Sequence, residues 1–259
     1  MRFGFLGGGK IAEAILSAIP SKKSVIVAER AAARRAELAA KYQIRAVDDL
    51  KGVFRLADII FLAVNPRDIE AVARVAKPFC TSSKTIVSVV PGKRLFRLRR
   101  LFGDKVALAR AMPNIGLLAK AGMTAICSES KIGKEEMSAI VEVFGASGEV
   151  VYLKEQFMDM MAAMGTGGLV CFAHLAKMLA EEGVDRGLTP EQARNAATQT
   201  LLGAGKLLRE SGGDIQTFID GMCVRGSVPA TGLETFAGSD VKVAVNNMFN
   251  AVVARIKEK

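Results

Sequence analysis

The sequence has few residues of the kinds that hold metal ions or stack on bases. Among its 259 residues there is no Trp, there are two Tyr, and aromatic residues make up 6% of the chain. This leaves little material for a nucleic-acid surface built on stacked aromatic rings. The four cysteines lie far apart without a C-x-x-C pair, and no second His accompanies His174. The pattern therefore predicts no zinc site.

Long hydrophobic runs are also scarce. Glycines and Lys10 interrupt the apolar start of the chain, which does not suit a signal peptide. The longest uncharged stretch lies between Asp159 and Lys177, contains glycines and His174, and falls short of the roughly 20 apolar residues of a membrane span. With scattered cysteines and no signal peptide, these features predict a soluble, cytoplasmic protein without a membrane partner.

The net charge of +10 is concentrated in the first half. Residues 1–150 carry 25 Lys and Arg against 14 Asp and Glu, whereas residues 151–259 carry 11 against 12. Such asymmetry can mark a nucleic-acid surface or a site for a polyanionic small molecule. The densest basic run, residues 93–100, has apolar residues at helical spacing. We expect a solvated helix face there and no nucleic-acid partner, and a nucleic-acid or partner surface is the alternative.

The first half alternates short apolar runs with helical patterns. The predicted strands are 3–6, 25–28, 59–64, 85–90, 106–109, 123–127 and 150–153. The predicted helices between them are 11–19, 31–42, 69–76 and 135–144. Strand–helix alternation at this spacing predicts an α/β fold with a doubly wound, mostly parallel sheet of the Rossmann type.

After about residue 153 the pattern becomes helical. We therefore place a dinucleotide-binding domain at 1–153 and an all-helical dimerisation and substrate-binding domain at 154–259. One long helix is expected at 157–182, crossed by a group of glycines. Residues 189–192, Thr-Pro-Glu-Gln, predict the start of another helix with a capping box and Pro at its first position.

The opening strand, turn and helix carry the motif G-x-G-x-x-A. Its first Gly permits a tight turn, its second lets the backbone approach a pyrophosphate, and Ala12 lets the helix pack close to the strand. The start of the helix offers N–H groups to phosphates. A merely structural turn is the alternative. The motif predicts a dinucleotide site formed by Gly7, Gly8, Gly9, Lys10 and Ile11.

Residues at the end of the second predicted strand bear on the choice of cofactor. Glu29 lies 22 residues after Gly7, where a carboxylate can bind the ribose hydroxyls of NAD and repel a 2′-phosphate. Arg30, Arg34 and Arg35 follow at once and could clamp that phosphate. We expect both NADH and NADPH to be used, with a slight preference for NADPH.

Four segments resemble motifs of one enzyme family. Residues 7–15, GGGKIAEAI, resemble GAGNMAEAI, and residues 63–66, AVNP, resemble AVKP. Residues 112–124 contain MPN followed by GMT, and residues 199–206, QTLLGAGK, resemble QTVLGAAK. Together and in this order they resemble the Δ1-pyrroline-5-carboxylate reductase family, and the similarity extends along nearly the whole chain.

The resemblance implies further cofactor residues. In that family the loop after the third strand and the MPN segment border the cofactor. The matching positions are Ala63, Val64, Asn65, Pro66 and Asn114. Pro66 could equally be a first-turn proline of a helix, whereas a polar side chain at the carboxyl edge of a strand, as expected of Asn114, faces the crevice where ligands bind.

Two segments depart from the family, and both belong to its substrate site. Where relatives read approximately SGSGPAY, residues 164–170 read MGTGGLV. Where relatives read SPGGTT, residues 226–231 read GSVPAT, so that Pro229 removes one backbone donor near the expected carboxylate site. The substrate-binding residues that the resemblance implies are Thr166, Gly167, Ser227, Ala230 and Thr231.

The resemblance implies reduction of the cyclic imine 1-pyrroline-5-carboxylate to L-proline with NADPH or NADH. Thr231 is the catalytic candidate, because a hydroxyl can both donate to and accept from the imine nitrogen. The alternatives are a related imine or keto-acid reductase and a weakly catalytic NAD(P)-binding sensor or scaffold. A small helical domain with apolar residues on several sides predicts an obligate homodimer or higher oligomer, with Thr231 and the glycine group meeting at the dimer seam.

Overall fold

The structure is a computed structural model that describes residues 1–258, and its contacts divide the chain into two compact units. The first unit consists of Met1–Thr166 together with the chain from Val252 onward. The second unit is Gly167–Ala251. The first unit holds all the strands, and the second is helical.

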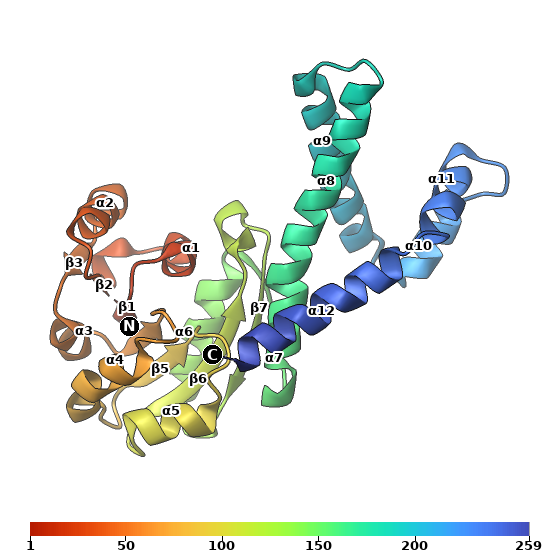
Figure 1. The fold of residues 1–259 in the computed structure, drawn as a ribbon. Coiled ribbons are helices and arrows are strands. Elements are labelled where there is room, and N and C mark those ends of the chain that lie inside the picture. Colours follow the sequence, from red (N-terminus) through yellow and green to blue (C-terminus); the bar gives the residue numbers. More distant parts are fainter. Residues whose placement is uncertain (259) are drawn as a thin grey trace. The chain divides into compact units, whose positions relative to one another are not determined.

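The first unit is built on one eight-stranded sheet in the order β3-β2-β1-β4-β5-β6-β7-β8 (Figure 1). Its strands are β1 (Phe3–Leu6), β2 (Val25–Ala28), β3 (Arg45–Val47), β4 (Ile59–Leu62), β5 (Thr85–Ser88), β6 (Ala107–Pro113), β7 (Gly122–Ser128) and β8 (Gly148–Tyr152). All neighbours are parallel except β6 and β7. The order reverses at β1 and β4, and ligands bind such sheets at the carboxyl edge of this switch point.

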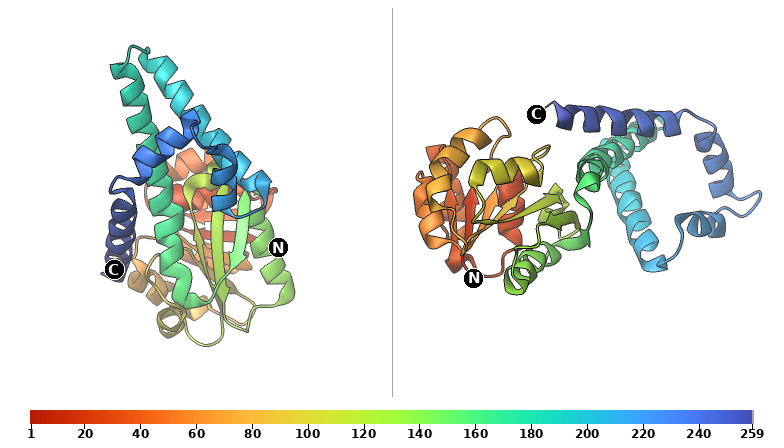
Figure 2. Two further views of the ribbon diagram at one scale, coloured as in Figure 1. Left: turned by 90° about the vertical axis from the view of Figure 1, so that its right-hand side faces the viewer. Right: turned by 90° about the horizontal axis from the view of Figure 1, so that it is seen from below.

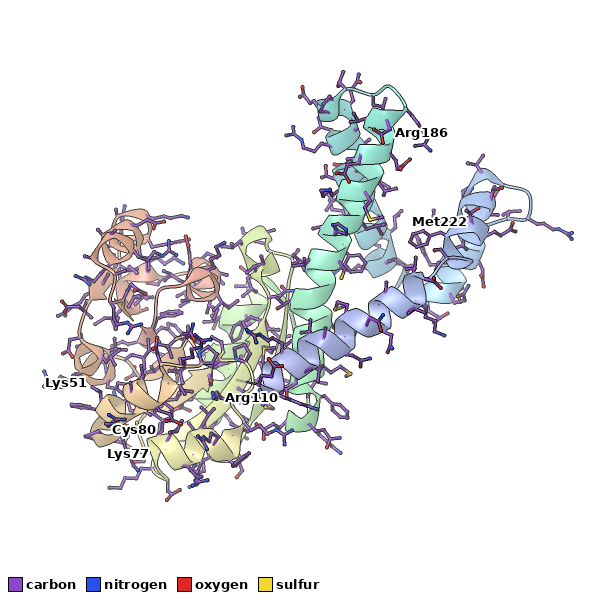
Figure 3. All side chains as sticks on the ribbon, in the orientation of Figure 1. Lys51, Lys77, Cys80, Arg110, Arg186 and Met222 are labelled. Atoms are coloured by element: carbon purple, nitrogen blue, oxygen red, sulfur yellow. The ribbon has the colours of Figure 1, made fainter. Side chains whose placement is uncertain are left out.

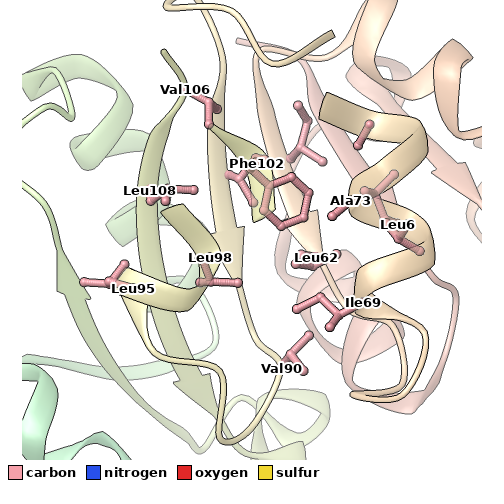
Figure 4. Close-up of a cluster of buried hydrophobic side chains, with 14 of the residues drawn as sticks. Leu6, Leu62, Ile69, Ala73, Val90, Leu95, Leu98, Phe102, Val106 and Leu108 are labelled. Carbon is pink, nitrogen blue, oxygen red and sulfur yellow. The ribbon is translucent and has the colours of Figure 1, made fainter. Parts of the chain in front are cut away.

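Helices cover both faces of the sheet (Figures 1 and 2). One face is covered by α1 (Lys10–Ala18), α2 (Ala32–Tyr42) and α6 (Lys134–Gly145). The other is covered by α3 (Leu50–Leu56), α4 (Ile69–Ala76), α5 (Leu95–Phe102) and α7 (Met158–Ala162). Figure 4 shows strand residues Leu6 and Leu62 in one cluster with Leu98 and Phe102 of α5. Burial on both faces explains the nearly continuous apolar strands.

The chain returns to the first unit after the second. Helix α12 (Val241–Lys257) places Ile256, which is 7% exposed, in the same apolar cluster as Val90 and Leu95. Gly92 makes this approach possible, because its φ is +74° and a β-carbon there would lie 2.5 Å from the Ile256 carbonyl oxygen. Residues that follow the second unit therefore complete the core of the first.

The basic run folds as the predicted amphipathic helix, α5. Leu95, Leu98 and Phe102 are buried, whereas Arg97 is exposed and forms an ion pair with Glu70 at 2.8 Å. Arg97 and Arg100 therefore lie on a solvated helix face, whereas Arg99 is half-buried and pairs with Glu129.

The predicted fold class is confirmed, and the expected strands and helices of the first half are present within a few residues. Two elements were missed, β3 and α3. Strand β3 is only three residues long and lies at the sheet edge with Arg45 exposed, so no apolar run indicates it. Helix α3 has Gly52 in its interior. Strand β6 extends to Pro113 because it pairs with β7 as far as Thr124.

The second unit contains α8 (Gly168–Asp185), α9 (Pro190–Ser211), α10 (Ile215–Met222), α11 (Val228–Ala237) and most of α12. Helices α8 and α9 lie side by side, joined by a short turn at Arg186 (Figure 3). Thr189 Oγ1 accepts from the Gln192 N–H at 3.2 Å, and Gln192 Oε1 accepts from the Thr189 N–H at 3.0 Å. The predicted capping box is therefore confirmed.

The expected long helix at 157–182 is a longer helical run that contains a π-helical turn, Ala163–Gly167. Residues Glu155–Asp185 are long and apolar enough to cross a membrane by length and composition alone, with 17% of the most apolar window buried. The uncharged stretch between Asp159 and Lys177, on which the sequence expectation rests, is shorter than this run. One such helix is weak evidence for a span, because helices of soluble proteins pass the same test. His174, on α8, is exposed.

Candidate functional site

A tight glycine turn joins β1 to α1. Gly7 has a φ of +99°, a conformation that suits only glycine, and a β-carbon there would lie 2.5 Å from the Ala63 carbonyl oxygen. The Gly7 N–H donates to the Ala28 carbonyl oxygen over 2.9 Å. At Gly9 a β-carbon would meet nothing within 4 Å, so this side of the turn is open to a ligand. The turn thus brings bare backbone to the switch point of the sheet.

A cavity of about 450 Å³ opens at this edge, over the carboxyl ends of β1, β2 and β4. The predicted residues that line it are Gly7, Gly8, Gly9, Glu29, Arg30, Ala63, Val64 and Asn65. Lys10, Ile11, Pro66 and Arg34 do not line it. Asp48 and Asp68 line it as well and were missed. Asp48 directly follows the missed strand β3, and parallel strands end at one edge, so identifying β3 would have identified Asp48.

The carboxylate of Glu29 holds the glycine turn from inside. Its Oε2 accepts from the Gly8 N–H at 2.8 Å, and its Oε1 accepts from the Ala31 N–H at 2.9 Å. A β-carbon at Gly8 would meet the end of the Leu38 side chain at 2.6 Å and the Glu29 carboxylate at 3.2 Å, so a larger residue there requires these side chains to shift. Glu29 therefore stands at the predicted ribose position with its carboxylate fixed by two backbone donors.

Two of the three arginines expected at a 2′-phosphate are held by other partners. Arg34 Nε donates to the Gly8 carbonyl oxygen at 2.8 Å, and its other nitrogens form ion pairs with Glu13 and Glu37. Arg35 donates to the carbonyl oxygens of Glu29 and Arg30. Only Arg30 both lines the cavity and keeps an exposed guanidinium, which pairs with Asp68 at 2.8 Å.

The loop after β4 forms the opposite wall of the cavity. Asn65 is exposed, and its Oδ1 accepts from the Arg67 N–H at 3.1 Å. The Asp68 N–H donates to the Asn65 carbonyl oxygen at 2.9 Å. Pro66 lies half-buried inside this turn, where its fixed φ supports the turn. The loop presents Ala63 and Val64 to the cavity.

Asn114 follows β6, and its side chain is directed into the protein. It is 8% exposed. Its Oδ1 accepts from the N–H groups of Gly116 and Met123, and its Nδ2 donates to the Gly165 carbonyl oxygen. Its amide is thus occupied by three backbone groups of the first unit.

A buried arginine within strand β6 was missed. Arg110 in β6 is 1% exposed and forms ion pairs with Glu155 at 3.1 Å and Asp159 at 3.3 Å (Figure 3). Glu155 also accepts from the Leu95 N–H at the start of α5. The signal was present in the sequence, since an Arg within an apolar strand requires buried partners.

The remaining predicted residues lie at or in the second unit. Ser227 is the N-cap of α11, and its Oγ accepts from the Ala230 N–H at 3.4 Å. Thr231 is exposed on the first turn of that helix, with its hydroxyl donating to the Ser227 carbonyl oxygen at 3.4 Å. Gly167 ends the π-helical turn that contains Thr166. Among residues 1–258, no three His, Cys, Asp or Glu side chains gather as a metal site.

Comparison with known families gives two matches. Residues 2–92 match the family described as NADP oxidoreductase coenzyme F420-dependent, and residues 155–259 match Pyrroline-5-carboxylate reductase dimerisation. The second match shows that the chain carries the dimerisation domain of that family.

Similar proteins cover most of the chain. The pyrroline-5-carboxylate reductase of Synechocystis sp. is 32% identical over 217 residues, which are 82% of this chain and 80% of that protein. A pyrroline-5-carboxylate reductase structure from Coxiella burnetii covers 99% of this chain and 97% of its own, with a TM-score of 0.89 and 22% identity. The Plasmodium falciparum enzyme with NADP bound has a TM-score of 0.86 at 23% identity, covering 100% and 97%. Given the identity to the Synechocystis protein, this chain belongs to the pyrroline-5-carboxylate reductase family.

Proposed function

We propose that this chain reduces the imine of 1-pyrroline-5-carboxylate to L-proline with NADH or NADPH. The observation that carries the proposal is the glycine turn at the switch point of the sheet, in a chain of this family. A bound nicotinamide coenzyme supplies the hydride. The chain binds and orients the reactants, and holding two reactants in line supplies much of the rate without covalent catalysis.

The residues around the cavity fit a dinucleotide. A β-carbon at Gly7 or Gly8 would fill the space between the turn and its neighbours, while the side of Gly9 is open. The phosphates would be held by Gly7, Gly8, Gly9, Lys10 and Ile11 at the start of α1. Glu29 would meet the adenosine ribose, and Ala63, Val64, Asn65 and Pro66 would form the far wall.

Arg30 is the residue through which NADPH would be recognised. Its guanidinium is exposed and paired only with Asp68 at 2.8 Å, so it can turn to a 2′-phosphate at small cost. Arg34 supports the turn through the Gly8 carbonyl oxygen and is not free to move. Both cofactors are used. Discrimination between them depends on the balance between Arg30, which attracts the 2′-phosphate of NADPH, and Glu29, which repels it.

The substrate residues are Thr166, Gly167, Ser227, Ala230 and Thr231. Thr231 is the catalytic candidate: its hydroxyl, now in a long 3.4 Å bond to the Ser227 carbonyl oxygen, can turn to donate to the imine nitrogen. In this division, residues 1–153 bind the cofactor and residues 154–259 supply the substrate residues and the dimer contacts.

One feature of α11 favours a second candidate, a related imine or keto-acid reductase. Pro229 has no N–H, and the Ala230 N–H already donates to Ser227 Oγ. The first turn of this helix therefore has fewer donors for a substrate carboxylate than a glycine-containing turn would have. A substrate with a smaller or differently placed anion would suit it.

The second unit also indicates its partner, a further copy of the chain. Large apolar side chains of α8 and α9 are exposed, including Phe172 (59%), Leu179 (53%) and Leu202 (49%). A helix that exposes apolar residues on several sides requires a partner. We place this homodimer or higher oligomer in the cytoplasm.

A steady-state assay with pyrroline-5-carboxylate, run with NADH and with NADPH, tests the proposal. Turnover on this substrate supports it. Turnover only on other imines or keto acids favours the second candidate. NAD(P)H binding without any turnover would leave a binding protein and reject both reductase assignments.

A further inference from the structure

The turn between α7 and α8 is π-helical over Ala163–Gly167. In a π-helix the hydrogen bonds run from residue i to residue i+5, and such turns are rare and often lie at functional sites. This turn carries Thr166, whose side chain is exposed, next to Gly165. It belongs to one of the two segments that depart from the family motif.

One side chain from the sheet holds this turn. Asn114 Nδ2 donates to the Gly165 carbonyl oxygen over 2.9 Å. A β-carbon at Gly165 would lie 3.6 Å from the same nitrogen, so the amide also packs directly against the turn. The oxygen of the amide accepts from Gly116 N–H at 3.1 Å and Met123 N–H at 3.2 Å. These two bonds fix the side chain to the helical turn Ile115–Ala119 after β6 and to the start of β7.

We propose that Asn114 is a positioning residue, which fixes the Gly165 carbonyl and thereby places Thr166 for the imine substrate. This differs from the cofactor contact that the sequence suggests for Asn114. Only an amide of this length offers an acceptor for two backbone N–H groups and a donor for a carbonyl at neutral pH. The inference rests on the proposed function, since Thr166 matters to catalysis only if this segment receives the substrate.

The variant Asn114→Asp separates the two halves of the amide. The carboxylate keeps the acceptor for Gly116 and Met123 but loses the donor and opposes the Gly165 carbonyl oxygen. We expect KM for the imine to rise about tenfold, the usual effect of losing one buried hydrogen bond, while the Kd for NADPH is unchanged. Asn114→Ser, which keeps a good cap for the following turn and lacks the reach to Gly165, should behave alike.

The pH profile gives a readout that a general loss of structure would not produce. Burial and the facing Gly165 carbonyl oxygen raise the pKa of this carboxyl group, against the Gly116 and Met123 N–H groups, which lower it. Once protonated, its O–H can donate to the Gly165 carbonyl oxygen. The imine KM of Asn114→Asp should therefore approach that of the unchanged enzyme as pH falls from 8 to about 5, whereas Asn114→Ser should show no such recovery.

Asn65→Asp is the matched control at the cofactor cavity. It places the same new charge at Asn65, in the loop after β4 that lines the predicted cofactor cavity, so it should raise the Kd for NADPH. If Asn114→Asp also raises that Kd and leaves the imine KM unchanged, Asn114 contacts the cofactor and the proposal is wrong.

Hydrogen–deuterium exchange of the peptide containing residues 163–167 separates this inference from the proposed function. Faster exchange in Asn114→Asp and in Asn114→Ser than in the unchanged protein supports the anchor even if pyrroline-5-carboxylate is not turned over. Unchanged exchange in both variants would overturn it, whatever the substrate is.

Discussion

Glu13 joins the two helices that flank the glycine turn, and replacing it with Gln tests how that turn is held. Its carboxylate accepts from Arg34, from Lys41 Nζ at 2.7 Å and from Tyr42 Oη at 3.0 Å. The hydrogen bond from Arg34, then that from Lys41, lowers the pKa of Glu13 from 4.5 to about 2. Arg34 in turn binds the Gly8 carbonyl oxygen, so Glu13 is linked to the cofactor cavity.

The size of the effect follows from that pKa. A fall from 4.5 to about 2 corresponds to at most about 3 kcal/mol of preference for the ionised group in the folded state. Lys41 is 56% exposed, and solvent screens its share, so we expect Glu13→Gln to lower the free energy of unfolding by about 1–2 kcal/mol at pH 7. Because the folded pKa is depressed, this stabilisation is complete above pH 4.5 and is lost as pH falls toward 2.

Urea unfolding of both proteins between pH 7 and pH 3 measures this. The difference in free energy should be constant above about pH 5.5 and shrink below pH 4.5. Glu13→Gln should also raise the Kd for NADPH, since Arg34 loses a partner. Glu37→Gln is the control, because Glu37 pairs with the same Arg34 at 2.8 Å but is 55% exposed. A difference that stays constant down to pH 3 would refute the reasoning.

Further predictions concern the cavity, the buried ion pairs and assembly. Arg30→Ala should raise KM for NADPH about tenfold and leave that for NADH unchanged, whereas Arg34→Ala should lower the melting temperature; equal effects of Arg30→Ala on both cofactors would contradict the clamp. Gly7→Ala should abolish NADPH binding in a fluorescence titration, because of its φ of +99° and the 2.5 Å approach to a carbonyl oxygen; retained binding would show that the turn relaxes. Arg110→Met should cost about 1–3 kcal/mol in urea unfolding, as it leaves two half-buried carboxylates without their cation, and an unchanged midpoint would mean that they reach solvent. Light scattering at micromolar concentration should give at least a dimer, and a fully active monomer of 27.5 kDa would contradict the assembly.

Much of the first unit could be predicted because its elements are periodic over several residues. Helix 69–76 was predicted at its observed bounds, since Ile69, Val72 and Ala76 fall on one face. Strand β3 was missed because three residues at a sheet edge carry no pattern of their own, and helix α3 was missed because it is short and has Gly52 in its interior. The position of β3 is set by its pairing with β2, and this pairing cannot be read from the sequence.

The local structure around the candidate site residues could be predicted where the backbone conformation sets it, but not where side-chain partners far along the chain set it. The positive φ of Gly7 could be predicted, because glycine is the residue that readily adopts this conformation. Arg34 and Arg30 look alike in sequence, yet Arg34 is held by Glu13 and Gly8 while Arg30 is exposed. Asn114 was placed at the correct strand end, and the direction of its amide depends on Gly165, 51 residues later. Such long-range partners cannot be read from spacing.

The return of α12 to the first unit has a consequence for synthesis. Ile256 fills a place beside Val90 and Leu95, yet it follows them by more than the 85 residues of Gly167–Ala251. At about 5–20 residues per second, the ribosome requires roughly 4–17 s to make that intervening segment. During this interval the nascent sheet presents an apolar gap at Gly92. The first unit therefore cannot complete its core until Ile256 has been synthesised. Chaperones have this interval in which to bind the exposed apolar surface.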